Sequence, residues 1–201
     1  MILTGPEILL QVESGDIEID PFDPKLINPA SIDLRLGARV AIYESWVTCT
    51  PKATNSIGIE DGSLFIPRDV PLDVKSHPHT RDFTIHEKVG WVLRPGIGYL
   101  MHTLERICTR DFVPVLDGKS SIGRLFTTIH VTAGYGDPNF SGQYTLEVIV
   151  QHPLRVYPGM RFAQMRFHRM TGEYLPYDGN YQGKDSIGPV ASKAYRQFQS
   201  S

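Results

Sequence analysis

Eight short runs of β-branched and aromatic residues, separated by glycine or proline, are the feature that most restricts the fold. Runs of this kind favour strands, and strands that follow one another without long helices between them favour a sandwich or barrel over βαβ units. The chain is therefore expected to be all-β. The runs are Ser31–Leu36, Val40–Tyr43, Ser63–Ile66, Gly90–Leu93, Tyr99–Thr103, Phe112–Leu116, Tyr144–Val150 and Met160–Phe167.

Only two helices are indicated. Thr4-Gly5-Pro6-Glu7 has the form of a capping box, in which the Thr4 hydroxyl and the Glu7 carboxylate satisfy backbone amides at the start of a helix. A helix over Gly5–Glu13 is expected to follow and to end at Ser14-Gly15. The second is a short helical pattern over residues 119–126, delivered by a turn at Asp117-Gly118.

The length of 201 residues suits one buried core, so residues 1–201 are expected to form a single domain. The last part, from Asp178 to Ser201, is rich in Gly, Ser, Gln and Lys and has no apolar period. This composition is typical of a mobile arm or lid.

The charges nearly balance, with 20 Lys and Arg against 22 Asp and Glu, so there is no basic field for nucleic acid or membrane binding. A polyanionic ligand would have to meet a local cluster of cations. Cys49 and Cys108 are too few and too far apart for a disulfide framework. The N-terminus lacks secretory features, and no apolar run has the length of a membrane span. The expectation is a soluble, cytoplasmic protein.

The segment after Phe112–Leu116 is suited to an anion. Free amides, the hydroxyls of Ser120 and Ser121, Lys119 and Arg124 would face one point at the start of the short helix. An ordinary serine-capped helix explains the same pattern equally well. It is no Walker A loop, because Val113 occupies the place of the first glycine.

Two carboxylates follow. Asp137 projects from the glycine-containing loop between His130 and Tyr144, although an Asp before proline is more often a turn former than a catalyst. Glu147 interrupts an apolar strand, and period-2 alternation places it on the face of Thr145 and Ile149. It is either solvated or lodged in a pocket as a proton shuttle.

Taken together, these residues resemble the dCTP deaminase family, a branch of the dUTPase-like fold, which is a distorted β-barrel or sandwich also called a β-clip. The spacing of the matching stretches holds over most of the chain. These stretches are Pro29–Gly37, Gly118–Arg124, His130–Ala133, Asp137–Gly142, Leu146–Glu147, Pro158–Met160 with Gln164, Tyr181–Gly183 and Gly188–Ser192.

The resemblance implies a role for each matching residue. Glu147 would be the general base and acid for attack of water at C4 of cytosine, with Ser120, Arg124 and the carbonyl of Ala133 holding the water and the ring. Asp137 would meet the sugar. The other implied substrate-binding residues are Lys119 and Ser121 at the triphosphate, Gln164 and Tyr177 in the pocket, and Ile122, Gly123, Thr145, Leu146 and Lys184.

The resemblance also implies partners. Magnesium is expected on the phosphates of the nucleotide rather than on the protein, and the chain is expected to form a homotrimer with shared sites. Inhibition by dTTP is left open. Zinc is not expected, because a zinc deaminase needs H-x-E and P-C-x-x-C, and His77 and His79 have no nearby thiol.

The expected reaction is deamination of dCTP to dUTP and ammonia. One alternative is a bifunctional enzyme that forms dUMP and pyrophosphate, since Ala133-Gly134-x-x-Asp137 resembles the loop of such enzymes. The other is a nucleotide-binding regulatory module without catalysis. Gly136, Asn180 and Lys184 depart from the family pattern, which leaves open a change in the lid or a modified substrate.

Overall fold

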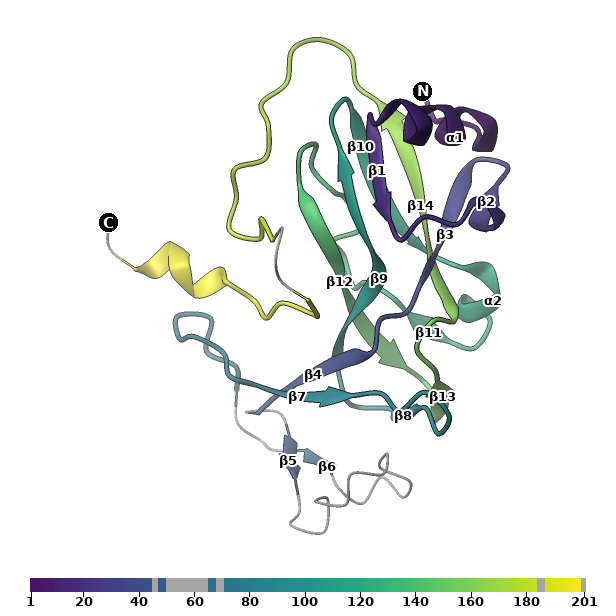
Figure 1. Ribbon diagram of the computed structural model, residues 1–201. Helices are drawn as coiled ribbons and strands as arrows, with labels where there is room; N and C mark the ends of the chain where they lie inside the picture. Colours follow the sequence, from purple (N-terminus) through teal and green to yellow (C-terminus); the bar gives the residue numbers. More distant parts are fainter. Residues whose placement is uncertain (45–46, 50–64, 68–70, 184–186, 200–201) are drawn as a thin grey trace.

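The computed structural model describes residues 1–44, 47–49, 65–67, 71–183 and 187–199 (Figure 1). Two main sheets make up the body. One has the strand order β11-β12-β9-β4-β7 with β1 also paired to β9, and the other has the order β10-β14-β3-β2. Two small pairs, β13-β8 and β5-β6, complete the strands. The predicted all-β class is confirmed.

The strands, in chain order, are β1 (Ile17–Asp20), β2 (Ile27–Asn28), β3 (Ser31–Arg35), β4 (Arg39–Tyr43), β5 (Val47–Cys49), β6 (Phe65–Pro67), β7 (Thr80–Thr84), β8 (Trp91–Leu93), β9 (Tyr99–Thr109), β10 (Phe112–Gly118), β11 (Thr127–Thr128), β12 (Ser141–Val150), β13 (Leu154–Val156) and β14 (Arg161–Arg169). The helices are α1 (Gly5–Ser14) and α2 (Ser120–Gly123), with 3-10 turns η1 (Pro24–Leu26) and η3 (Ala194–Phe198).

One hydrophobic cluster joins the two main sheets. It includes Leu34 of β3 and Phe162 of β14 from one sheet, and Met101 of β9 and Leu146 of β12 from the other, all fully buried. Burial of these side chains from water supplies the main driving force for packing the sheets. Among the described residues, no helix has the length and apolar character needed to cross a membrane.

Most predicted strands are present, with shifted ends. The run Tyr99–Thr103 extends to Thr109 because β9 has β1 as a further partner there, with Ile17 opposite Thr109. Residues 63 and 64 of the predicted strand Ser63–Ile66 lie outside the described residues, and β6 begins at Phe65. The strand β7 was not predicted, because its residues show no clear alternation of apolar and polar side chains.

Three local predictions are wrong. Thr4 is the N-cap of α1, but its side chain makes no capping hydrogen bond, and the Glu7 carboxylate contacts Gln11 and Arg169 instead of closing a capping box. Asp117-Gly118 is no turn, since it continues β10 against Gln164 and Ala163 of β14. The helix expected to reach residue 126 ends at Gly123, after which a turn leads to Phe126 in the left-handed region.

A buried ion pair joins the two sheets. The carboxylate of Glu105 on β9 is 1% exposed and accepts hydrogen bonds from the backbone N–H of Arg35 on β3 at 2.9 Å and from its Nε at 2.6 Å. Removal of one partner from such a pair leaves a charge without compensation in the interior. The pair therefore links β3 to β9, and loss of either side chain is expected to destabilise the fold.

Replacement of Glu105 by glutamine is expected to lower the free energy of unfolding by about 2 kcal/mol, because the amide keeps the shape and loses the charge that compensates Arg35. Urea unfolding measures the change. Glu18→Gln is the matched control, since Glu18 faces Arg110 at 3.6 Å with both side chains more than half exposed. An equal loss in the two variants would contradict the buried pair's importance.

Candidate active site

Glu147 lies in the middle of β12 and faces away from the core. Its neighbours Leu146 and Val148 are buried, whereas Thr145, Glu147 and Ile149 are partly exposed, as the alternation predicts. Across the sheet, Glu147 pairs with Leu100 of β9, and Leu100 pairs with Ala41 of β4. The glutamate therefore sits on a sheet face that three strands build.

A cavity of about 220 Å³ opens beside Glu147. One carboxylate oxygen of Glu147 accepts a hydrogen bond from the backbone N–H of Val131 at 2.9 Å, which ties the strand to the loop that precedes it. The rest of the wall is formed by Tyr43, Gly98, Tyr99, Leu100, Val148 and Ile149. Glu147 was expected either on a solvated sheet face or in a pocket, and the structure supports the pocket.

The two tyrosines in this wall stay protonated near neutral pH. Burial raises the pKa of Tyr99 to about 12, and its hydroxyl accepts a hydrogen bond from the backbone N–H of Arg94. Burial also raises the pKa of Tyr43. Glu147 therefore has neutral hydroxyls and apolar groups around it, and the described residues place no cation in the wall of its cavity.

Asp137 is exposed and lines a second, larger cavity of about 390 Å³. The loop that carries it is held against β10, where the N–H of Gly136 donates to the carbonyl of Pro114 at 2.8 Å and the carbonyl of Gly134 accepts from Leu116 at 2.7 Å. A Cβ at Gly136 would lie 2.7 Å from the hydroxyl oxygen of Tyr144. Tyr144 thus fills the space that a side chain at residue 136 would need.

Aromatic rings shape the second cavity. Phe140 packs edge-on against Tyr144 and Tyr177, with ring centroids 5.0 Å and 5.9 Å away. The remaining wall consists of Tyr135, Gly136, Gln143, Thr145, Tyr181 and Val190. Flat apolar walls with a few polar groups are typical of a site for a small organic ligand.

The two cavities adjoin each other along β12. Thr145 lines the larger one and Glu147 the smaller one, and residues two apart on a strand are separated by about 7 Å. The spacing suits one ligand that spans both cavities. The two carboxylates singled out in the sequence, Asp137 and Glu147, therefore belong to one region of the surface.

The cation-rich segment around α2 lies elsewhere. Lys119 places its ammonium 2.7 Å and 2.8 Å from the two oxygens of Asp33, a fully buried carboxylate on β3. Gln164, expected in the substrate pocket, donates from its side-chain amide to the carbonyl of Gly118 at 3.1 Å. Lys119 and Gln164 therefore hold the start of α2 in place in this chain.

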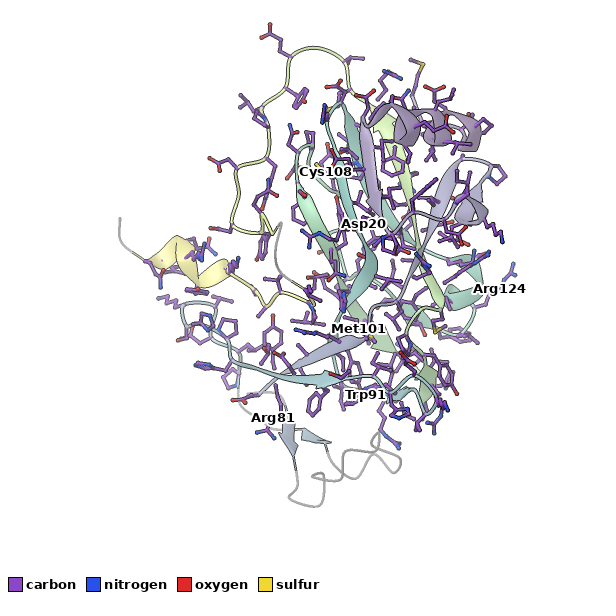
Figure 2. All side chains as sticks on the ribbon, in the orientation of Figure 1. Asp20, Arg81, Trp91, Met101, Cys108 and Arg124 are labelled. Carbon is purple, nitrogen blue, oxygen red and sulfur yellow. The ribbon has the colours of Figure 1, made fainter. Side chains whose placement is uncertain are left out.

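Ser120 and Ser121 on α2 and Arg124, the residue that follows it, are exposed and belong to the wall of neither cavity. Figure 2 shows Arg124 at the edge of the molecule opposite the C-terminal turn η3. The structure thus does not bring the α2 residues and Glu147 together within one chain.

The other predicted site residues are placed as follows. Ala133 and Gly123 are exposed, while Ile122 and Leu146 bury their side chains in the core, which leaves their backbones for any ligand contact. Tyr177 lines the larger cavity and receives a hydrogen bond from the N–H of Tyr181. Lys184 lies outside the described residues.

Tyr43, Phe140 and Tyr144 were missed by the sequence reasoning, although all three line a cavity. Their one signal was aromatic character at the edge of a strand or loop, which core residues share. For metals, the described residues contain no group of three or more His, Cys, Asp or Glu side chains that could hold an ion.

Comparison with known proteins gives consistent matches. A family model described as "dCTP deaminase-like" matches residues 2–170. A protein of Leptospira biflexa is 40% identical over 200 residues, covering 99% of both chains, and one of Clostridium beijerinckii is 39% identical with the same coverage. A protein of Hathewaya histolytica is 36% identical over 200 residues, covering 99% of this chain and all of the relative. Each is named "dCTP deaminase, dUMP-forming".

Among solved structures, a 2'-deoxycytidine 5'-triphosphate deaminase from Agrobacterium tumefaciens matches with a TM-score of 0.57 and 20% identity. The match covers 83% of this chain and 46% of the solved chain, and it bears on the fold alone. The names of the three relatives overturn one expectation: because each is said to form dUMP, the expectation of a reaction that ends at dUTP is wrong.

Proposed function

The chain belongs to the dCTP deaminase-like family of enzymes with a dUTPase-like β-fold, and from this premise we propose that it converts dCTP to dUMP, ammonia and pyrophosphate. The observation that carries the proposal is the pair of adjoining cavities on β12, one lined by Glu147 and the other by Asp137. Two hydrolytic steps need two positioned water molecules, and two carboxylates in one region can serve them.

The first step is deamination. Glu147 takes a proton from water and delivers it to N3 while the hydroxide adds to C4 of cytosine; it then takes the proton of the new C4 hydroxyl and delivers it to the departing amine as the C4 carbonyl forms. One water is consumed and one ammonia leaves. A carboxylate in a largely apolar wall, held by the Val131 amide, is suited to this exchange. The carbonyl of Ala133, with Ser120 and Arg124, would hold the water and the polarised ring.

The second step is hydrolysis at the α-phosphorus of the uracil nucleotide. Asp137 positions a second water for in-line attack, and the bond to the β-phosphate oxygen breaks to give dUMP and pyrophosphate. The exposure of Asp137 in the wall of the larger cavity supports this role. The aromatic rings of Phe140 and Tyr177 would enclose the sugar.

The triphosphate would be met by Ser121, Arg124 and the amides at the start of α2, with Lys119 and Lys184 as further cations. A magnesium ion bound to the phosphates would neutralise part of their charge. The ion would be held by the phosphate oxygens and not by a protein site, and the exposed carboxylate of Asp137 at the larger cavity is compatible with a cation there. Because the substrate is a free nucleotide, we place the enzyme in the cytoplasm.

A complete site requires two copies of the chain. Ser120 on α2 and Arg124 directly after it are exposed and line neither the Glu147 nor the Asp137 cavity, so another copy would have to bring its α2 segment to these cavities. A closed ring in which each copy lends α2 to its neighbour satisfies every copy at once. We therefore propose the homotrimer implied by the family, with a lone chain inactive.

The proposal is tested by the balance of products. Incubation with dCTP and Mg²⁺ is expected to release ammonia and pyrophosphate in equal amounts, as measured by two independent enzymatic assays. Ammonia without pyrophosphate would overturn the second step, and release of neither would overturn the enzymatic function for this substrate. Parallel incubation with CTP is the control for recognition of the deoxyribose.

A further inference from the structure

The end of the chain crosses the sheet face that carries Glu147. Three alternate backbone amides of this segment each donate to a side chain: Gly188 to Gln143 at 2.9 Å, Val190 to Thr145 at 3.0 Å and Ser192 to Tyr43 at 3.0 Å. Figure 1 shows this part of the tail beside β12 and β4. A period of two is that of an extended chain, in which alternate amides point the same way.

The tail is therefore seated on side chains rather than on the backbone of a strand. Gln143 and Thr145 lie on β12 and Tyr43 ends β4, and all three acceptors are partly buried. The first contact also uses Arg39, which donates to the carbonyl of Ile187 at 3.2 Å. Gly188 has φ 113°, a backbone conformation that favours glycine, so the tail enters this seat through a fixed bend.

Of the three acceptors, Tyr43 is the one that lines the cavity of Glu147. It also lines a smaller cavity of about 110 Å³, whose wall includes Ser192 and Tyr195 of the tail. The sheet register explains this placement, because Ala41, two residues before Tyr43, pairs with Leu100, which in turn pairs with Glu147. One ring thus separates the catalytic cavity from the tail.

The hydroxyl of Tyr43 is an acceptor in this contact. Burial raises its pKa, so it remains neutral beside the carboxylate and can accept from the Ser192 amide throughout the neutral range. Tyr181 fixes the next residue in the same way, by accepting from the N–H of Lys193 at 2.9 Å. Two consecutive amides of the tail are therefore held by two tyrosine hydroxyls.

We propose that Tyr43 is a positioning residue of the reaction, whose hydroxyl seats the tail at residue 192 and so holds Val190 in the wall of the larger cavity, beside the cavity of Glu147. The inference rests on the proposed function for its effect on turnover. It assigns to Tyr43 no contact with the reacting atoms. It also gives Thr145 a contact with the tail in addition to its place in the cavity wall.

The direct test compares trypsin cleavage after Lys193 in the wild type and in Tyr43→Phe. Phenylalanine keeps the ring in both cavity walls and removes only the acceptor, so the cleavage rate at Lys193 and the KM for dCTP are expected to rise about fivefold, the equivalent of one hydrogen bond. Tyr157→Phe, at an exposed tyrosine between β13 and β14, is the matched control and should change neither.

Ser192→Pro removes the donor of the same hydrogen bond and suits the extended backbone before it. Ser192→Ala keeps the amide but loses the hydroxyl that accepts from the Ala194 N–H at 3.2 Å, so it is the reference for Ser192→Pro. In the Tyr43→Phe background, Ser192→Pro is expected to give no increase in cleavage or KM beyond that of Ser192→Ala. Additive effects of the two substitutions, or unchanged cleavage in Tyr43→Phe, would overturn the inference. Cleavage does not depend on turnover, so this outcome is distinct from failure of the proposed function.

Discussion

Replacement of Glu147 by glutamine is expected to abolish the conversion of dCTP while nucleotide binding survives. Glutamine has the size of glutamate, and its carbonyl oxygen can still accept the hydrogen bond from the Val131 amide. It cannot take a proton from water, and general acid and base catalysis contributes a factor of about 10² to 10⁴. The loss should therefore fall on kcat, at about a thousandfold or more, and not on the affinity for dCTP.

Release of ammonia from dCTP and calorimetric titration with the nucleotide measure the two quantities separately. Glu44→Gln is a suitable control, since Glu44 is half exposed, pairs loosely with Arg81 at 3.8 Å and lines neither cavity. Turnover retained in Glu147→Gln would show that another group moves the protons. Loss of binding with unchanged kcat would instead make Glu147 a binding residue.

The second large effect is the recovery of activity when two inactive variants are mixed. Glu147→Gln and Arg124→Ala are each expected to be inactive alone, because each removes one half of every site. In a mixed ring, a neighbouring pair can combine an intact Glu147 with an intact Arg124, and random mixing gives this combination in about one quarter of sites. Activity should thus reappear to about this fraction of the wild type.

The variants are mixed in equal amounts under conditions that allow exchange of subunits, and ammonia release is followed with time. Arg124→Ala mixed with Ser120→Ala is the control, because both changes lie on α2 and no mixed site is intact. A mixture of the first two variants that stays inactive after exchange would contradict a site shared between copies. Activity of a dilute, monomeric chain would contradict it as well.

Residues with a short-range signal could be predicted from the sequence. Glu147 is an example, because a charged residue in an apolar strand is visible in the alternation of five or six neighbours, and the structure places it beside a cavity. The glycine loop before Asp137 is another, since close approach to β10 requires residues without a side chain at positions 134 and 136. Both depend on local geometry alone.

Residues whose partner is distant in the chain could not be predicted. The ammonium of Lys119 is paired with Asp33, 86 positions earlier in the chain, and no residue near Lys119 in the sequence indicates this pair. The acceptors of the tail, Gln143 and Tyr43, likewise depend on amides 45 and 149 positions away. Asp117-Gly118 was expected to form a turn from its residue types, and its pairing with β14, far ahead in the sequence, is not visible locally.

The expectation that the reaction ends at dUTP was wrong because the role of Asp137 could not be decided from local sequence. The Asp137 loop carried the signal of a bifunctional enzyme, yet an Asp before proline is also a common turn former, and the sequence does not tell which way its side chain faces. In the structure, Asp137 lines the larger cavity next to that of Glu147. The proposed second hydrolytic step assigns its water to Asp137 in that position.

The most direct test of one site with two hydrolytic steps is a time course of dCTP, dUTP and dUMP, separated by chromatography after addition of dCTP and Mg²⁺ to the wild-type chain. Because the two cavities adjoin each other, dUMP is expected to appear without a lag, and dUTP should not accumulate beyond the amount of enzyme. A lag in dUMP with a growing pool of free dUTP, or dUTP as the final product, would contradict it.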